Sequence, residues 1–279
     1  MQTLDGKYEA LLSYLRGLEG VVVAYSGGVD STFLLMAVRD CGVAVLAVTG
    51  VSPSTPSSDL DTALDMAKSI SVAHEVVRTG ELEDERYSDN PPDRCFYCKS
   101  ELFKKLKAIA EAKSLPHVID GSNVDDLGDY RPGLRAKALY GVKSPLAEVG
   151  LTKDEIRELS RQKGLKTWDR ASSPCLSSRI PYGEQITVSA LQMVEQAEIA
   201  LKELGFGTMR VRKHGDMARI EFLDADIEKA VRPEIKEAIV RRLRDIGFLY
   251  ITLDMEGYRA GSLNRVLLSA DGVPTAQRV

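Results

Sequence analysis

Short apolar runs alternate with longer mixed segments over roughly the first 165 residues. Four runs rich in β-branched residues lie at positions 21–24, 43–48, 74–77 and 117–119. Each is separated from the next by a segment long enough for a helix, which is the pattern of a doubly wound parallel sheet. In such sheets, ligands bind at the carboxyl ends of the strands. We therefore expect an α/β domain whose site lies where these strands end.

The last helix of this region begins at a recognisable signal. Thr152 and Glu155 have the spacing of a capping box, in which each side chain accepts a hydrogen bond from the other residue's backbone. The residues after this helix are irregular and rich in Ser, Pro and Arg. The sequence thus predicts a first domain over 1–170 and a junction loop over 171–186 that carries Cys175.

A different pattern occupies the remaining residues, 187–279. One helix ends at Gly205-Phe206 and another ends at Gly247-Phe248, and each leads into a strand, which makes a weak internal repeat. Alternating apolar and polar residues on both sides of a short turn predict a hairpin between the two helices. We expect a second, smaller α+β domain here.

Composition limits the kind of protein without identifying it. The chain has 279 residues, 44% of them apolar, with a net charge of −4. No apolar run approaches the roughly 20 residues that cross a bilayer, so we expect a cytoplasmic protein without a membrane partner. The small negative charge argues against a nucleic-acid partner, because such binding depends on a basic surface. Four cysteines in a reducing compartment favour reactive, metal-binding or buried thiols over disulfides.

A glycine- and serine-rich turn follows the first predicted strand and precedes a predicted helix. It contains Ser26, Gly27, Gly28, Asp30 and Ser31. Glycines allow a tight turn that presents N–H groups, the helix N-terminus adds positive partial charge, and the serines add hydroxyl donors. The segment lacks both the lysine of a Walker A loop and the glycine spacing of a dinucleotide-binding loop. It predicts an anion site of another kind.

This loop resembles the SGGxDS motif of the PP-loop ATP pyrophosphatases. The resemblance continues in residues 121–126, after the fourth predicted strand, and implies that Asn123 and Asp126 help bind the nucleotide. For residues 121–126 the alternative is an Asx-rich turn without a ligand. The family implies a PP-loop fold, Mg²⁺ as a cofactor and cleavage of ATP between its α- and β-phosphates to adenylate a substrate, with Asp30 as a catalytic residue.

The cysteines indicate which chemistry such a fold supports. Cys95 and Cys98 precede a helical run, where a Cys-x-x-Cys pair can bind zinc or an iron–sulfur cluster, act in redox chemistry, or do none of these. Cys175 lies in a polar loop, which favours a reactive or ligating thiol over a buried one. Cys41, at the end of the first helix of the sheet, is interpreted as a core or surface thiol.

Taken together, the motifs resemble the LarE family of ATP-dependent sulfur transferases along essentially the whole chain. The resemblance rests on residues 26–31, 94–99, 121–126, 131–133 and 173–179. It implies that the carboxylate of pyridinium-3,5-biscarboxylic acid mononucleotide is adenylated and converted to a thiocarboxylate during synthesis of the nickel-pincer nucleotide cofactor of lactate racemase. It also implies a homo-oligomer, with a mononucleotide substrate and a sulfide source as partners.

Two sulfur sources exist within such a family. In one, Cys175 gives up its own sulfur and becomes dehydroalanine; in the other, three cysteines hold a 4Fe-4S cluster whose open iron carries sulfide. Because this chain has Cys95 and Cys98 as well as Cys175, we favour the cluster with these three ligands. For the substrate phosphate, the candidates are three arginines that suit bidentate contacts, although each of them is equally well interpreted as a solvated charge: Arg179, Arg210 and Arg212.

Two other functions remain open from the sequence. A tRNA 2-thiolation enzyme can combine a PP-loop with a three-cysteine cluster, but it needs a broad phosphate-binding surface. A non-enzymatic protein that binds structural zinc and senses a nucleotide would use the same cysteines and the same loop. The net charge favours a small substrate over tRNA.

Overall fold

The computed structural model describes residues 3–128, 132–259 and 261–267, so Arg131 of the family-like segment 131–133 lies outside the described residues. The described chain divides into two compact units. The first comprises Met1–Asp84 and Asp93–Ser173, and the second comprises Glu85–Pro92 and Pro174–Val279. No helix within the described residues is both long enough and apolar enough to cross a membrane.

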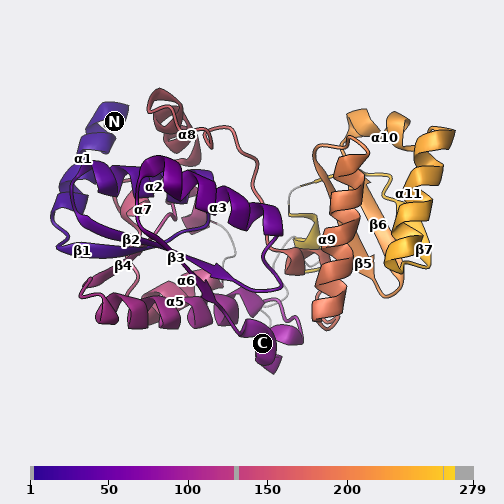
Figure 1. The fold of residues 1–279 in the computed structure, drawn as a ribbon, viewed down its shortest axis with the longest axis horizontal. Coiled ribbons are helices and arrows are strands. Elements are labelled where there is room, and N and C mark those ends of the chain that lie inside the picture. The colour runs from indigo at the N-terminus through magenta and orange to yellow at the C-terminus, as the bar shows by residue number, and fades with distance from the viewer. Residues whose placement is uncertain (1–2, 129–131, 260, 268–279) are drawn as a thin grey trace. The chain divides into compact units, whose positions relative to one another are not determined.

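A four-stranded parallel sheet forms the centre of the first unit (Figure 1), and its strand order is β3-β2-β1-β4. The strands are β1 (Gly20–Ala24), β2 (Ala44–Val51), β3 (His74–Arg78) and β4 (His117–Asp120). They coincide with the four apolar runs of the sequence within a few residues. The expected α/β architecture with a parallel sheet is thus confirmed.

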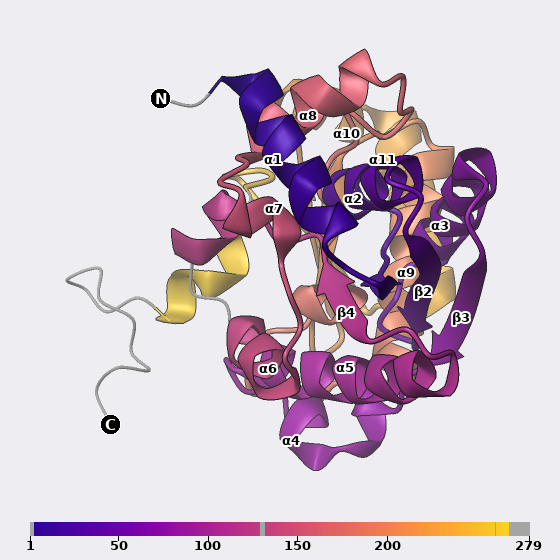
Figure 2. The same cartoon turned by 90° about the vertical axis from the view of Figure 1, so that its left-hand side faces the viewer.

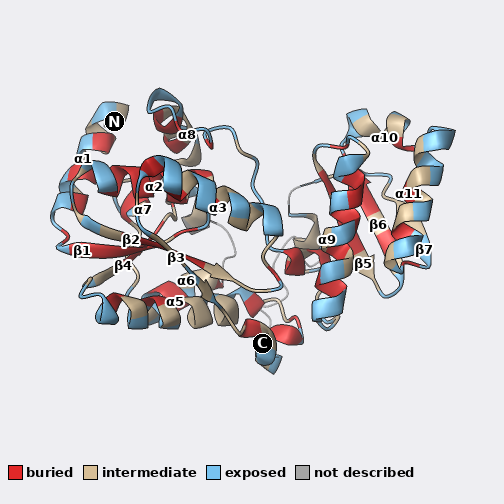
Figure 3. Cartoon of the chain, in the orientation of Figure 1, coloured by how far each residue is buried: buried red, intermediate tan, exposed pale blue. Residues whose placement is uncertain are grey.

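Helices cover both faces of this sheet (Figure 2). The helices of the first unit are α1 (Leu4–Arg16), α2 (Val29–Asp40), α3 (Ser57–Ile70), α5 (Arg94–Ala112), α6 (Gly133–Tyr140), α7 (Pro145–Glu148) and α8 (Lys153–Gln162). Val21 and Val23 pack with α1, α2, α3 and α8, whereas Val22 packs with α5 and α6 on the other face. Because successive strand side chains point to opposite faces, one apolar run serves both cores. Figure 3 shows the buried residues along these strands.

The strand order places a switch point between β1 and β4. The chain runs outward from β1 to β2 and β3 and returns to the other side of β1 as β4, so the loops after β1 and β4 diverge from a common crevice. The two loops touch at Gly121: a Cβ there would lie 2.8 Å from the backbone nitrogen of Ser31 and 3.1 Å from the carbonyl carbon of Asp30. Glycine is therefore required for the two loops to meet.

The second unit contains a three-stranded sheet of order β5-β6-β7, in which β5 and β6 form the expected hairpin and β7 runs parallel to β6. Its elements are α4 (Glu85–Ser88), α9 (Val188–Glu203), β5 (Met209–His214), β6 (Met217–Phe222), α10 (Asp224–Ala230), α11 (Pro233–Ile246) and β7 (Tyr250–Leu253). The two Gly-Phe repeats end α9 and α11: Gly205 and Gly247 have positive φ, and Phe206 and Phe248 are buried in one core. Each glycine allows the left-handed turn that sends the chain back onto the sheet.

We predict that Gly121→Ala destabilises the protein by about 1–3 kcal/mol, because the added methyl group forces the backbones of the two loops apart. Gly207→Ala is the matched control, since a Cβ at Gly207 meets nothing within 4 Å and its φ is not positive. Urea unfolding of both variants measures the effect. Equal stability of the two variants would contradict the tight contact.

Candidate active site at the ends of β1 and β4

The loop after β1 forms an anion cradle. Ser31 Oγ lies 3.1 Å from Ser26 Oγ and donates to the Gly28 carbonyl at 3.3 Å, which closes the loop on itself. Gly28 is the N-cap of α2 and contributes no side-chain cap, so the first N–H groups of the helix are left for another acceptor. Gly27 has a φ of +69°, and a Cβ there would lie 2.7 Å from the Cα of Ala63. The expected serines and glycines thus build the N-terminal turn of α2.

Asp30 contacts a residue that lies far away in the sequence. Lys153 Nζ donates to Asp30 Oδ2 at 2.6 Å, and the Lys153 N–H donates to Asp125 Oδ2 at 2.7 Å. Lys153 therefore links the β1 loop to the β4 loop. The other carboxylate oxygen of Asp30, Oδ1, is buried and makes no hydrogen bond with any described residue. A buried carboxylate oxygen without a donor suits a bound cation.

A second basic residue, Arg170, reaches the same loop. Its Nη1 donates to the Gly27 carbonyl at 3.1 Å, and its Nη2 pairs with Asp59 Oδ1 of α3 at 2.8 Å. Arg157 of α8 donates to the carbonyls of Trp168 and Arg170, both at 2.9 Å. Hydrogen bonds within the first unit thus hold both the backbone and the side chain of Arg170.

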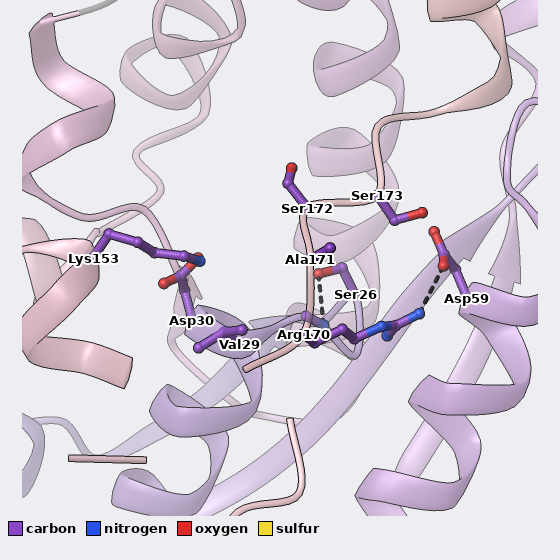
Figure 4. A pocket seen from close by; sticks show the side chains of 10 residues that line it. Ser26, Val29, Asp30, Asp59, Lys153, Arg170, Ala171, Ser172 and Ser173 are labelled. Carbon is purple, nitrogen blue, oxygen red and sulfur yellow. Dashed lines mark hydrogen bonds and ion pairs between the residues drawn. The ribbon is translucent and has the colours of Figure 1, made fainter. Parts of the chain in front are cut away.

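These groups line a cavity of about 200 Å³ (Figure 4). Figure 4 shows Lys153 and Asp30 pointing toward one another and Arg170 reaching toward Asp59. The lining residues are Ser26, Gly28, Val29, Asp30, Asp59, Lys153, Arg170, Ala171, Ser172 and Ser173. Two basic side chains, hydroxyl groups and a helix N-terminus around one small cavity favour phosphate groups as the ligand.

The side chains expected to bind the nucleotide in the β4 loop hold that loop together. Asn123 is buried, its Oδ1 accepts from the Asp125 N–H at 2.9 Å, and its own N–H donates to Asp126 Oδ2 at 3.0 Å. These contacts make an Asx-rich turn, and nucleotide binding by Asn123 and Asp126 stays a prediction. In the structure, Asn123 and Asp126 shape a loop that presents Asp125 to α8.

Cys95 and Cys98 lie within a helix instead of in the loop before it, because α5 already begins at Arg94. After Pro92 the sequence contains no Gly or Pro up to Ala112, so nothing delays helix formation. Spaced by three residues, the two thiols share one face of the helix at its positive end, which favours thiolate.

Cys175 belongs to the second unit and its backbone is firmly held. The Arg179 Nη1 donates to the carbonyls of Pro174 at 2.7 Å and Cys175 at 3.1 Å, and the Ser178 N–H also donates to the Cys175 carbonyl. The side chain of Cys175 is exposed. The loop thus presents an accessible thiol on a fixed backbone.

A segment that interrupts the first unit in sequence also supports this loop. Tyr87 and Asn90 are both buried. The Tyr87 hydroxyl lies 2.7 Å from Ser177 Oγ, and Asn90 Nδ2 donates to the carbonyls of Ile180 at 3.2 Å and Pro181 at 2.6 Å. Residues 85–92 are therefore part of the second unit, a detail that the helix and strand pattern did not reveal.

The three candidate phosphate-binding arginines differ in their surroundings. Arg179, only 2% exposed, pairs bidentately with Glu198 at 2.9 Å, and Arg212 pairs in the same way with Glu221 at 3.0 and 2.9 Å. Arg210 is different, because burial and then the nearby charge of Arg179 lower the pKa of its guanidinium. Its Nη1 also donates to the Met209 carbonyl at 2.8 Å, and its guanidinium lies 5.1 Å from the centre of the Tyr258 ring. The role of these three arginines in binding a substrate phosphate stays a prediction.

The described residues bring together no group of three or more His, Cys, Asp or Glu side chains that could hold a metal ion. Cys95 and Cys98 belong to the first unit and Cys175 to the second, so the three-cysteine cluster stays a prediction. Cys41 packs against the core of the first unit, its Sγ donates to the Leu12 carbonyl at 3.6 Å, and burial raises the pKa of its thiol.

Lys153, Arg170 and Asp59 are site residues that sequence reasoning missed. Lys153 carried one signal: it is the first residue of α8, where a positive charge opposes the helix dipole. The expected capping box of Thr152 and Glu155 is confirmed at this helix start. Arg170 and Asp59 carried no comparable signal, because only the folded chain brings them to the loop.

Comparison with known proteins identifies relatives over nearly the full length. The chain is 36% identical over 276 residues to pyridinium-3,5-bisthiocarboxylic acid mononucleotide synthase of Lactiplantibacillus plantarum, covering 97% of this chain and 98% of that protein. It is 46% identical over 265 residues to an uncharacterised protein of Synechocystis, covering 95% and 99%. An uncharacterised protein of Methanocaldococcus jannaschii is 30% identical over 240 residues, covering 86% and 91%. No family model matches the chain.

We predict that Arg179→Met lowers the free energy of unfolding of the ligand-free protein by about 3 kcal/mol or more, because it leaves Glu198 buried without its partner. In Arg179→Met/Glu198→Met the unpaired charge is gone, and about half of the loss should be recovered. Denaturant unfolding of the wild type and both variants provides the test. If Arg179 served only to bind substrate, Arg179→Met would be as stable as the wild type.

Proposed function

The chain belongs to the LarE family, and we propose that it is an ATP-dependent sulfur transferase. Its substrate would be pyridinium-3,5-biscarboxylic acid mononucleotide, whose carboxylate becomes a thiocarboxylate in synthesis of a nickel-pincer nucleotide. The full-length similarity to a protein named as the bisthiocarboxylic acid mononucleotide synthase supports the sulfur-transfer chemistry and this substrate class.

The first step proposed is adenylation. A carboxylate oxygen of the substrate attacks the α-phosphorus of ATP, the bond to the β-phosphate breaks, and pyrophosphate leaves. The anion cradle of α2, together with Lys153 and Arg170, supplies the positive charge that would hold the phosphates. The carboxylate carbon is a poor electrophile until its oxygen belongs to an AMP leaving group.

Mg²⁺ fits the same loop. The buried Oδ1 of Asp30, which accepts no hydrogen bond from any described residue, is a hard oxygen ligand at the edge of the phosphate cavity. When bound, the ion would neutralise charge on the phosphates as pyrophosphate leaves. Asp30 would orient the nucleotide through this contact.

The second step proposed is attack of sulfide on the acyl carbon, with departure of AMP. The observation that carries this assignment is the short tether between cavity and thiol: Ser173 lines the phosphate cavity, and Cys175 follows two residues later. Two residues span at most about 7 Å, so the covalent chain keeps the backbone of Cys175 near the cavity residue Ser173 for every arrangement of the two units. A sulfur-bearing group at Cys175 would thus reach an adenylate formed there.

We propose Cys95, Cys98 and Cys175 as ligands of a 4Fe-4S cluster. Cys95 and Cys98 share one face of a helix N-terminus, and Cys175 is exposed, so all three fit a thiolate donor set. When bound, such a cluster would supply sulfide from its fourth, protein-free iron. Arg210, whose guanidinium lies 5.1 Å from the centre of the Tyr258 ring, is the proposed contact for the mononucleotide phosphate.

The alternative functions make opposite predictions in solution. A tRNA-thiolating enzyme would bind tRNA tightly at low salt, whereas an enzyme for a mononucleotide would not retain tRNA. A zinc-binding nucleotide sensor would be colourless after anaerobic purification and would release no pyrophosphate. The proposed enzyme would be brown and would release pyrophosphate from ATP in the presence of substrate.

We predict that Cys95→Ala and Asp30→Asn separate the two steps. Cys95→Ala should lose bound iron and repeated turnover, while pyrophosphate release continues at about the wild-type level, because the phosphate cavity is untouched. Asp30→Asn should lose pyrophosphate release by about 100-fold or more, since the cation and Lys153 both lose their carboxylate. Pyrophosphate and thiocarboxylate are measured in parallel. Loss of pyrophosphate release in Cys95→Ala would mean that the cysteines act structurally.

Mass spectrometry of the protein after turnover distinguishes the two sulfur sources. We predict an unchanged mass, because the sulfur transferred comes from added sulfide. If Cys175 gave up its own sulfur, the protein would lose about 34 Da as H₂S and would stop after one turnover. Cys175→Ala abolishes thiocarboxylate formation by either route and serves as the negative control.

A further inference from the structure

We infer that Lys153 is a phosphate-binding residue that is held by Asp30 until ATP and its cation arrive together. In the nucleotide-free protein the ammonium group neutralises Asp30; on binding, the cation takes the carboxylate and the phosphates take the ammonium group. This inference rests on the proposed function, because it assumes that the cavity binds ATP.

The geometry supports this exchange. Lys153 Nζ lies 2.6 Å from Asp30 Oδ2, both side chains remain partly exposed, and both line the phosphate cavity. A lysine with a flexible stem can swing from the carboxylate to a phosphate in the same cavity without moving the backbone. Its backbone is fixed meanwhile, because the Lys153 N–H donates to Asp125.

The place of Lys153 in its helix indicates a role beyond stability. Lys153 is the first residue of α8, at the end where the helix dipole is positive, and acidic residues are favoured there. The two following residues, Asp154 and Glu155, obey this preference. Lys153 is an exception to this preference. Its ammonium group lines the phosphate cavity, where it could bind an anionic ligand.

Charge balance favours a site in which Asp30 and Lys153 pair with each other when no ligand is bound. Without a ligand, an unpaired Asp30 beside the helix N-terminus would bind stray cations, and an unpaired Lys153 would bind stray anions. The ion pair satisfies both groups. Arg170 differs, because its guanidinium is held by the Gly27 carbonyl and by Asp59, so it stays in place as a fixed positive charge.

The test is Lys153→Met, with Lys7→Met as the matched control. Lys7 also pairs with a carboxylate at the start of α8, Glu155 at 2.8 Å, but it does not line the cavity. ATP affinity is measured by calorimetry with Mg²⁺ present and without the carboxylate substrate, so that the cation can take Asp30 while no turnover occurs. Lys153→Met should bind ATP about 10- to 100-fold more weakly, the loss of one charge-assisted contact. Lys7→Met should match the wild type.

The same substitution should strengthen the binding of a divalent cation. Without nucleotide, Lys153→Met should bind Mn²⁺ about five- to tenfold more tightly than the wild type in electron paramagnetic resonance titrations, because Asp30 is then released from its competing cation. Adding Asp30→Asn to this variant should abolish the gain. Lys153→Gln is measured beside it, and thermal unfolding shows that each variant is folded.

Two results would contradict the exchange, provided that the wild type binds ATP and releases pyrophosphate. One is that folded Lys153→Met binds ATP as tightly as the wild type. The other is that Lys153→Met binds Mn²⁺ no more tightly than the wild type. In either case the proposed function stands. If the wild type itself binds no ATP, the proposed function fails, and the inference fails with it.

Discussion

The close contact between the end of β4 and the start of α2 is the constraint on which the site depends. With a side chain at Gly121, the β4 loop would be pushed off the backbone of Ser31. The contact brings the Asx turn of residues 123–126 beside the anion cradle, and that turn in turn receives the first N–H of α8 on Asp125. One missing methyl group thus allows three segments to meet at the switch point of the sheet.

The charged side chains at this meeting point differ in how many partners they have. Arg170 is fixed by two partners within the first unit, and Asp125 is fixed by its loop and by α8. Asp30 and Lys153 instead satisfy each other and leave the buried Oδ1 of Asp30 without a hydrogen bond from the described residues. This arrangement would suit the proposed ATP site, because preorganised charge stabilises a transition state while Asp30 and Lys153 would remain available for the ligand.

Local patterns predicted the parts of this protein that depend on local physics. The four strands, the capping box of α8 and the two Gly-Phe helix ends follow from periodicity and turn chemistry, and all are present. The start of α5 was placed too late, because Cys-x-x-Cys suggested a loop where nothing prevents a helix. The sequence did not indicate Lys153 or Arg170 as site residues, nor the buried ion pairs that Arg179 and Arg212 form. Arg212 and Glu221 pair across the predicted hairpin, whereas the partners of the other three residues lie 19 to 143 residues away, a separation that no local pattern encodes.

The few residues that follow Arg170 connect a guanidinium held by two partners to a cysteine whose backbone is held. Upstream, Arg157 and the Gly27 carbonyl hold Arg170; downstream, Arg179 holds the carbonyls of Pro174 and Cys175. The chain between these anchors lines the phosphate cavity with Ala171, Ser172 and Ser173. Because two residues span at most about 7 Å, the backbone of Cys175 stays within that distance of Ser173 along the chain. The proposed transfer of sulfur to an activated acyl group would need this proximity, and the order of residues along the chain would provide it.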